Sequence, residues 1–238
     1  MDASFWLARW RANDIGFNLP KPHPALVEAW GEIGAAPGTQ VLVPLAGKSV
    51  DMVWLAEQGH DVLGIELSGT AVADFFQERS RRPSTTEEHG YRVSRAGPYE
   101  LWCGDIFEFP TEATRRIGAV YDRAALVAMP YVMQADYVRK LAELTPAGVP
   151  MLLVSLTYDP SEMAGPPFSV GPDRIASLAN GLFTVAKLGA RDGLAASPRL
   201  REKGLTHLTE TTYLLKRTSR MPERVTNRLP EPPSHRHG

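Results

Sequence analysis

Two short apolar segments separated by a turn of small residues constrain the fold of this chain more than any other feature. Residues 40–45 predict a buried strand followed by Gly47, and residues 61–66 predict a second strand that ends at Glu66, 19 residues after that glycine. In nucleotide-binding βαβ units, about 20 residues separate the glycine turn from the acid that binds the ribose. A small turn lets a ligand approach the backbone, and a carboxylate at the end of the second strand can accept both ribose hydroxyls. The spacing therefore predicts a site for a cofactor that contains adenosine.

Two other nucleotide-binding motifs fit this turn less well. The run Gly47-Lys48-Ser49 resembles the end of a phosphate-binding P-loop, but that motif needs a glycine five residues before Gly47, where this sequence has Leu42. No Gly-x-Gly-x-x-Gly pattern follows the first strand, which argues against a nicotinamide dinucleotide. An acid without a diphosphate-binding loop suits a cofactor that has a ribose and no phosphate. S-adenosylmethionine is the candidate.

Composition narrows the class of protein. With 238 residues, of which 43% are hydrophobic and 22% charged, the chain suits one sizeable α/β domain. A net charge of −1 gives no electrostatic case for binding nucleic acid or an anionic membrane. The longest apolar stretch, around residues 149–156, is too short to span a bilayer, and a single cysteine, Cys103, fits a reducing compartment. We expect a cytoplasmic protein whose partner is a small molecule; a monomer is compatible with these properties.

Alternation of strand-like and helix-like segments predicts a doubly wound, mostly parallel α/β sheet with one antiparallel strand. Seven strands are expected, at residues 40–45, 61–66, 99–103, 117–122, 149–157, 183–188 and 207–216. Residues 79–98 are polar and predict an irregular surface insertion, whereas residues 217–238 are rich in proline and basic residues and predict a disordered tail. The sequence thus predicts a single domain at residues 1–216, which begins with helices in residues 1–34.

Ligands of such sheets bind at the carboxyl ends of the strands, and three acids lie there: Glu66, Asp105 and Asp122. Asp105 could accept a hydrogen bond from an adenine amino group while Ile106 packs on the ring, or Asp105 could simply belong to a turn. Arg123 could reach a second substrate or form an ion pair with Asp122. These two pairs of alternatives stay open at the level of sequence.

Five blocks of sequence, taken in order, resemble one known family. They are Phe5-Trp6-x-x-Arg9-Trp10 with Ile15-Gly16-Phe17, Val43-Pro44-Leu45-Ala46-Gly47-Lys48, Gly64-Ile65-Glu66-Leu67-Ser68, Asp122-Arg123-x-Ala125-Leu126-Val127-Ala128, and Tyr158-Asp159-Pro160 with Gly165-Pro166-Pro167-Phe168. Through about Lys216 the chain resembles the thiopurine S-methyltransferase family, within the S-adenosylmethionine-dependent methyltransferases of Rossmann-like fold. Two positions depart from the family pattern: Asn18 replaces the usual histidine and Ala46 the usual cysteine.

The resemblance implies a seven-stranded sheet of the class I methyltransferase type with an N-terminal helical lid over the cofactor. Without it, aromatic residues at helical spacing would be assigned to the core. The implied cofactor-binding residues are Trp6, Trp10, Phe17, Leu45, Gly47, Glu66, Leu67, Asp105, Ile106 and Arg123. The implied catalytic residues on the acceptor side are Arg123 and Arg199, and Arg201 is a less well aligned alternative to Arg199.

The implied activity is transfer of a methyl group from S-adenosylmethionine to the sulfur of a small aromatic or heterocyclic thiol. Such a displacement needs alignment and desolvation rather than a side-chain nucleophile, and arginine would stabilise the thiolate. An apolar wall for a planar ring is expected from Phe17, Pro166, Pro167 and Phe168. Two alternatives remain: a small inorganic acceptor such as halide, thiocyanate, or a selenium or tellurium species, and a non-catalytic module that binds S-adenosylmethionine. The six histidines form no set of metal ligands.

Overall fold

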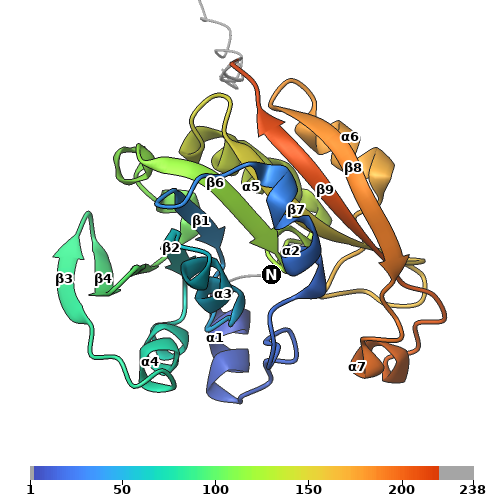
Figure 1. Cartoon of the computed structure of the whole chain (residues 1–238). Coiled ribbons are helices and arrows are strands. Elements are labelled where there is room, and N and C mark those ends of the chain that lie inside the picture. Colours follow the sequence, from blue (N-terminus) through green and yellow to red (C-terminus); the bar gives the residue numbers. More distant parts are fainter. Residues whose placement is uncertain (1–2, 220–238) are drawn as a thin grey trace, which may run out of the picture.

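The computed structural model of the protein describes residues 3–219, in which one mixed sheet lies between helices (Figure 1). The strands of this sheet are β1 (Gln40–Pro44), β2 (Asp61–Glu66), β3 (Ser84–Glu88), β4 (Tyr91–Ala96), β5 (Tyr99–Cys103), β6 (Ile117–Arg123), β7 (Pro150–Thr157), β8 (Phe183–Asp192) and β9 (Thr209–Arg217). The α-helices are α1 (Ala3–Arg11), α2 (Pro24–Ala29), α3 (Asp51–Glu57), α4 (Gly69–Gln77), α5 (Tyr131–Leu144), α6 (Pro172–Ala179) and α7 (Pro198–Glu202). Short 3-10 helices are η1 (Trp30–Ile33), η2 (Ile106–Glu108), η3 (Thr111–Thr114) and η4 (Leu126–Ala128).

The strand order β3-β4-β5-β2-β1-β6-β7-β9-β8 places the predicted βαβ unit at the centre of the sheet. Strands β5, β2, β1, β6 and β7 run parallel to one another. The pairs β3–β4, β4–β5, β7–β9 and β8–β9 are antiparallel. The order reverses between β1 and β6, which is the topological switch point at which sheets of this kind bind ligands.

The prediction of a seven-stranded, mostly parallel sheet is wrong in the number of strands and in the direction of the strands near both edges. The sheet has nine strands, and half of its neighbouring pairs are antiparallel. Residues 79–98, expected to be irregular, contain the hairpin β3–β4, whose two-residue turn is His89-Gly90. Both turn residues have positive φ, 50° and 81°, as the tight turns that fit twisted hairpins require. The exposed β3 has no apolar face, so hydrophobic patterning could not reveal it.

Two apolar layers hold helices against the faces of the sheet. One layer joins α2, η1, α3 and α4 to one face, and the other joins α5 and α6 to the opposite face. In Figure 1, α2 and α3 lie in front of the sheet, and α5 and α6 lie behind it. The central strands β1 and β2 are almost wholly buried, as expected for parallel strands covered on both sides. This double cover fixes the strand ends that surround the site.

The C-terminal boundary of the folded part lies beyond the expected one. Arg217, placed in the tail by the sequence prediction, is the last residue of β9 and is 4% exposed. Its Nε donates a hydrogen bond to the carbonyl oxygen of Ala142 at 2.7 Å, which joins the end of β9 to α5. The rest of the predicted tail, from residue 220 on, lies outside the described residues. Within residues 3–219, no helix combines the length and the apolar character that crossing a membrane requires.

Candidate active site

A cavity of about 1390 Å³ opens at the carboxyl ends of β1, β2 and β6. Helices α1 and α7 lie at this end of the sheet, and both contribute to its lining (Figure 1). The backbone is unusual where it enters the cavity, because the non-glycine residues Leu45 and Ala124 have φ values of 47° and 65°. Each follows the end of a strand, β1 or β6 respectively. Such left-handed conformations are costly for residues with a Cβ and concentrate at functional sites.

Glu66 is the acid whose surroundings are most specific. Its side chain lines the cavity, although the residue is only 6% exposed. One carboxylate oxygen accepts a hydrogen bond from the Gly47 amide at 2.8 Å, and the other accepts from the Ser68 amide at 2.7 Å. Burial raises the pKa of Glu66, and these backbone amides partly offset that effect. Each oxygen keeps a second lone pair, so the carboxylate can still accept hydrogen bonds from a ligand.

The turn after β1 is shaped by close contact with α1. A Cβ on Gly47 would lie 3.1 Å from the Trp10 ring, and its φ is 55°, so glycine suits this position twice over. Lys48, the lysine of the rejected P-loop reading, turns away toward α4. Its Nζ donates to Glu78 at 2.6 Å and to Asp74 at 3.3 Å. The lysine therefore pairs with Asp74 of α4 and with Glu78, the residue that caps the C-terminal end of this helix.

Residues after β2 and β5 line the same part of the cavity. Leu67, Asp105 and Ile106 all contribute to its wall, and Ile106 is only 4% exposed. Asp105 caps η2, because its carboxylate accepts a hydrogen bond from the Phe107 amide at 2.9 Å. Asp105 thus does stabilise a turn, as one of the two alternatives for this residue expected. Its exposed side chain also borders the cavity.

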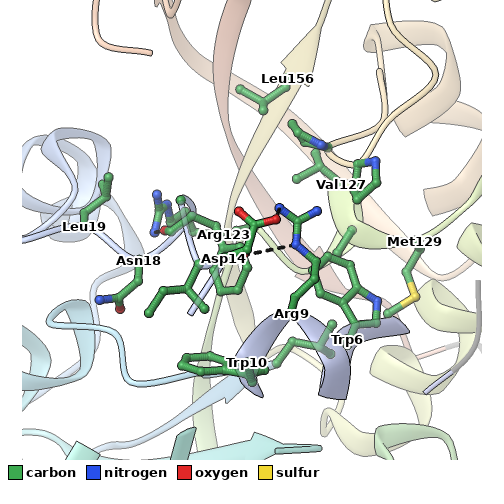
Figure 2. Close-up of a pocket in the computed structure, with 18 of the residues that line it drawn as sticks. Trp6, Arg9, Trp10, Asp14, Asn18, Leu19, Arg123, Val127, Met129 and Leu156 are labelled. Atoms are coloured by element: carbon green, nitrogen blue, oxygen red, sulfur yellow. Dashed lines mark hydrogen bonds and ion pairs between the residues drawn. The ribbon is translucent and has the colours of Figure 1, made fainter. Parts of the chain in front are cut away.

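Three aromatic residues expected to cover the cofactor form one cluster at the cavity. Phe17 lies between the two tryptophans, with ring centroids 5.9 Å from Trp6 and 5.8 Å from Trp10. All three line the cavity, and Trp10 is 6% exposed. Figure 2 shows Trp6 and Trp10 on the same ribbon segment, with Arg9 between them in the sequence. The aromatic residues are therefore both packed together and part of the wall.

Arg123 has partners that the sequence did not predict. Its expected partner, Asp122, instead accepts hydrogen bonds from the Tyr137 hydroxyl at 2.8 Å and the Leu126 amide at 3.1 Å. Neighbouring residues of a strand point to opposite faces, so the two side chains diverge. Arg123 donates to the Phe17 carbonyl oxygen at 3.0 Å and lies 3.9 Å from the Asp51 carboxylate. Among residues 3–219 no other hydrogen bond engages its guanidinium, which leaves donors for a ligand.

Arg199 reaches the cavity from α7. It lines the cavity, whereas Arg201 does not, which favours Arg199 of the two candidates. Its Nη1 lies 3.8 Å from the Asp14 carboxylate, and a Cβ on Gly16 would lie 2.1 Å from the same nitrogen. The Asp14 carboxylate also pairs with Arg9 at 2.9 Å, and Figure 2 shows the two side chains next to each other. Asp14 thus lies between two guanidinium groups at the cavity mouth.

The apolar wall differs from the expected one at a single residue. Phe17, Pro166 and Pro167 line the cavity, together with Val127 and Met129. Phe168 does not. Its ring lies over Gly165, where a Cβ would be 2.6 Å from Cδ1, and its amide donates to the Val127 carbonyl oxygen at 2.7 Å. Phe168 therefore holds the proline segment in place.

A buried polar cluster beside the cavity was missed by the sequence analysis. Asp51, 1% exposed, accepts hydrogen bonds from the His23 amide at 2.8 Å and the Tyr121 hydroxyl at 3.0 Å. The His23 ring lies 3.1 Å from the carboxylate of Glu210, and both residues line the cavity. Burial alone would raise the pKa of Glu210, but His23 and Arg191 lower it. The sequence feature that could have revealed this cluster is Asp51 itself, an acid in an otherwise apolar first turn of α3.

Metal and thiol chemistry have no support among the described residues. Within residues 3–219, no group of three or more histidine, cysteine or acidic residues could hold a metal ion. Burial raises the pKa of Cys103, which keeps the thiol in its unreactive protonated form.

Comparison with known proteins connects this site to one family. The sequence matches the family model for thiopurine S-methyltransferase over residues 1–218. A thiopurine S-methyltransferase of Pseudomonas syringae pv. syringae (strain B728a) is 41% identical over 220 residues, covering 92% of this chain and 100% of that protein. One of Methylococcus capsulatus (strain Bath) is 43% identical over 217 residues, covering 91% and 98%.

Solved structures share the fold at low sequence identity. An S-adenosylmethionine-dependent methyltransferase of Anabaena variabilis gives a TM-score of 0.63 at 15% identity, covering 91% of this chain and 96% of that chain. The 1,6-didemethyltoxoflavin-N1-methyltransferase of Burkholderia thailandensis, solved with 1,6-didemethyltoxoflavin and S-adenosylhomocysteine, gives 0.59 at 17% identity, covering 91% and 87%. The Rossmann-like fold is therefore that of S-adenosylmethionine-dependent methyltransferases.

The mixed sheet, with a buried acid at the end of β2 and a cavity beside it, has the fold of S-adenosylmethionine-dependent methyltransferases, and the family match assigns the chain to that class. Within that class, the chain belongs to the thiopurine S-methyltransferase family. It is therefore an enzyme that uses S-adenosylmethionine as its methyl donor, and the non-catalytic alternative is wrong. The residues present fit this cofactor, because Glu66 is a buried acid on the cavity wall whose two carboxylate oxygens can each accept a further hydrogen bond, as a pair of ribose hydroxyls requires.

Proposed function

We propose that this enzyme methylates the sulfur of a small aromatic or heterocyclic thiol similar in shape to a thiopurine. The observation that carries the proposal is the pairing of an apolar wall with one guanidinium in the same cavity. Phe17, Pro166, Pro167 and Met129 offer a slot for a planar ring, and Arg123 keeps unpaired donors beside it. An apolar pocket with a few placed polar groups is the usual form of a small-molecule site.

On the cofactor side, Glu66 would accept the ribose hydroxyls, while Leu45 and Gly47 would contact the cofactor through their backbone. Ile106 and Leu67 would pack on the adenosine, and Asp105 would accept from the adenine amino group. When bound, S-adenosylmethionine supplies a methyl group activated by a positively charged sulfur. The aromatic cluster of Trp6, Trp10 and Phe17 would lie near that charge, attract it through its ring faces, and exclude water.

On the acceptor side, Arg123 would stabilise the thiolate form of the acceptor before attack. A positive charge beside a thiol lowers the thiol pKa and so raises the thiolate fraction at neutral pH. Arg199 would add a second positive charge at the cavity mouth. No side chain needs to act as a nucleophile, because alignment and desolvation supply most of what this displacement requires.

We also propose that the N-terminal segment acts as a lid. Residues 3–17 precede the sheet, line the cavity, and are fastened by the bond from Arg123 to the Phe17 carbonyl oxygen. Hydrogen exchange of these amides should slow when S-adenosylhomocysteine is added, because closure over the ligand protects them. Equal exchange with and without the ligand would assign Trp6 and Trp10 to the static core.

An acceptor panel tests the proposed substrate class. Labelled S-adenosylmethionine is supplied with thiophenol, a mercaptopurine, an aliphatic thiol, iodide, thiocyanate and selenite, and kcat/KM is measured for each. We expect the aromatic and heteroaromatic thiols to exceed the inorganic acceptors at least about tenfold, since a ring gains apolar contact that an ion cannot. If iodide or thiocyanate exceeds every aryl thiol, the small inorganic acceptor replaces the thiol.

A further inference from the structure

Asp51 lies where three segments that build the cavity meet. It belongs to the first turn of α3, directly after the turn that follows β1. One of its carboxylate oxygens accepts from the His23 amide, in the segment that leads from the lid to α2. The other accepts from the Tyr121 hydroxyl at 3.0 Å and lies 3.9 Å from Arg123 Nη1. A single buried carboxylate thus joins the cofactor turn, β6 and the N-terminal segment.

Asp51 is surrounded by polar and charged groups from several elements. From β6 it faces Tyr121 and Arg123, and from the N-terminal segment it faces the backbone of His23. The imidazole of His23 turns to Glu210 of β9, which pairs in turn with Arg191 of β8 at 2.6 Å. Among residues 3–219, Arg123 is the one cation within ion-pair distance of Asp51. The positive charge that faces the acceptor is therefore partly balanced from behind by Asp51.

We propose that Asp51 is a positioning residue that sets both the direction and the effective charge of Arg123. The proposal rests on the proposed function, in which Arg123 stabilises an acceptor thiolate. The Asp51 carboxylate lies at ion-pair distance, 3.9 Å, from Nη1, and the Phe17 carbonyl oxygen accepts a hydrogen bond from the same Nη1, so the other guanidinium donors stay free for a ligand in the cavity that Arg123 lines. Its negative charge also weakens the field of Arg123 at the acceptor, because two opposite charges seen from one side partly cancel.

The two effects predict opposite changes when the charge is removed. In Asp51→Asn, the uncompensated Arg123 lowers the pKa of a bound thiol, so the midpoint of the kcat profile for thiophenol, which reports groups in the enzyme–substrate complex, moves to lower pH. The expected shift is on the order of half a pH unit to one pH unit. The loosened guanidinium at the same time lowers kcat on the alkaline plateau about three- to tenfold. Simple damage to the fold would lower kcat without moving the midpoint.

Two further variants separate charge from position. Asp51→Glu keeps the charge and moves it, so its midpoint should stay at the wild-type pH while kcat falls. Tyr121→Phe removes the hydroxyl contact of the same carboxylate and leaves the Asp51 side chain in place, so its midpoint should not move to lower pH. An equal acid shift in Tyr121→Phe and Asp51→Asn would overturn the proposal, because disruption of the cluster would then explain both. If Asp51→Asn does not fold, Asp51→Glu decides: an altered midpoint with the charge retained overturns it.

A readout without turnover separates this proposal from the proposed function. Hydrogen exchange of residues 17–23 should be faster in Asp51→Asn than in the wild type, because the His23 amide loses its charged acceptor and the partner of Arg123 is gone. If no thiol is methylated by the wild type, the proposed function fails, and this exchange rate still tests the positioning role. Unchanged exchange together with an unchanged midpoint would show that Asp51 positions nothing.

Discussion

The proposed cofactor half and the proposed acceptor half of the cavity are held together by different kinds of contact. Around Glu66 the contacts are made by backbone amides that lie 2 and 19 residues away in the sequence. Around Arg123 they come from the Phe17 carbonyl oxygen, 106 residues away, and from the Asp51 carboxylate, which also accepts from a Tyr121 hydroxyl 70 residues away from it. The contacts that hold Glu66 all lie within one βαβ unit, whereas those that hold Arg123 form only when distant segments meet.

Because the contacts differ in kind, amino-acid substitutions should affect the two halves differently. Backbone amides keep their positions when side chains change, so the acid at the end of β2 has a fixed frame. Side-chain partners such as Asp51, Asp14 and the Phe17 segment change with each substitution in them. We therefore expect cofactor binding to tolerate substitutions elsewhere in the cavity, and acceptor preference to respond to them.

The largest expected effect is that of Glu66→Ala. The variant removes the acceptor for two ribose hydroxyls, which should weaken S-adenosylhomocysteine binding by roughly 1.5–3 kcal/mol in calorimetry. It also strands the amides of Gly47 and Ser68, so the free energy of unfolding should fall, by about 1–3 kcal/mol for each buried amide that finds no water. Glu66→Gln keeps one acceptor oxygen and should lose less of both. If Glu66→Ala bound S-adenosylhomocysteine as tightly as the wild type, Glu66 would not belong to the cofactor site.

Asp122 near the end of β6 serves as the comparison for Glu66, because it is also a buried acid near a strand end but does not line the cavity. Burial raises its pKa from 3.8 to about 6. The folded protein therefore keeps this proton at pH values where the unfolded chain has lost it, and the stabilising contribution of the group is complete below about pH 4 and lost as pH rises to about 6. The loss amounts to about 3 kcal/mol. Urea unfolding should show that Asp122→Asn removes this decline while cofactor affinity stays unchanged.

Arg123→Ala tests whether the two halves are separate. It removes a charge and the bond to the Phe17 carbonyl oxygen, and turnover of an aryl thiol should fall about ten- to a hundredfold below the acceptor's free pKa, with a smaller loss above it. Cofactor affinity, measured by calorimetry, should fall less than in Glu66→Ala. An equal loss of affinity would mean that Arg123 belongs to the cofactor half as much as to the acceptor half.

The smallest expected effect comes from Gly16→Ala. The new Cβ would meet the guanidinium of Arg199, an exposed and flexible side chain that can move away. We expect kcat/KM for the acceptor to fall two- to fivefold with unchanged cofactor affinity, because a rim charge contributes modestly. Gly31→Ala is the matched control, since no atom lies within 4 Å of its Cβ position. An equal loss in both variants would show that Arg199 does not act on the acceptor.

The same division explains what sequence alone could predict. Strands β1, β2 and β5 and the residues at their ends follow from apolar runs, small turns and a fixed spacing, which are local properties. The partner of Arg123 could not be predicted, because neighbouring Asp122 points to the other face and Asp51 approaches only in the folded chain. The five residues of α7 are too few for a helical period. Arg217 was placed in the tail because its partner, the Ala142 carbonyl oxygen, lies far away in sequence.

The outermost strands of the sheet carry features that discourage association between molecules. Within residues 3–219, β3 and β8 each have one edge with no strand beside it, and such edges can recruit strands of other molecules into aggregates. Strand β3 reads Ser-Thr-Thr-Glu-Glu, so its edge presents hydroxyls and negative charge instead of an apolar ladder. The register of β8 is interrupted between Lys187 and Gly189, which breaks the regular row of backbone groups. Both ends of a nine-stranded sheet are thereby poor templates for aggregation.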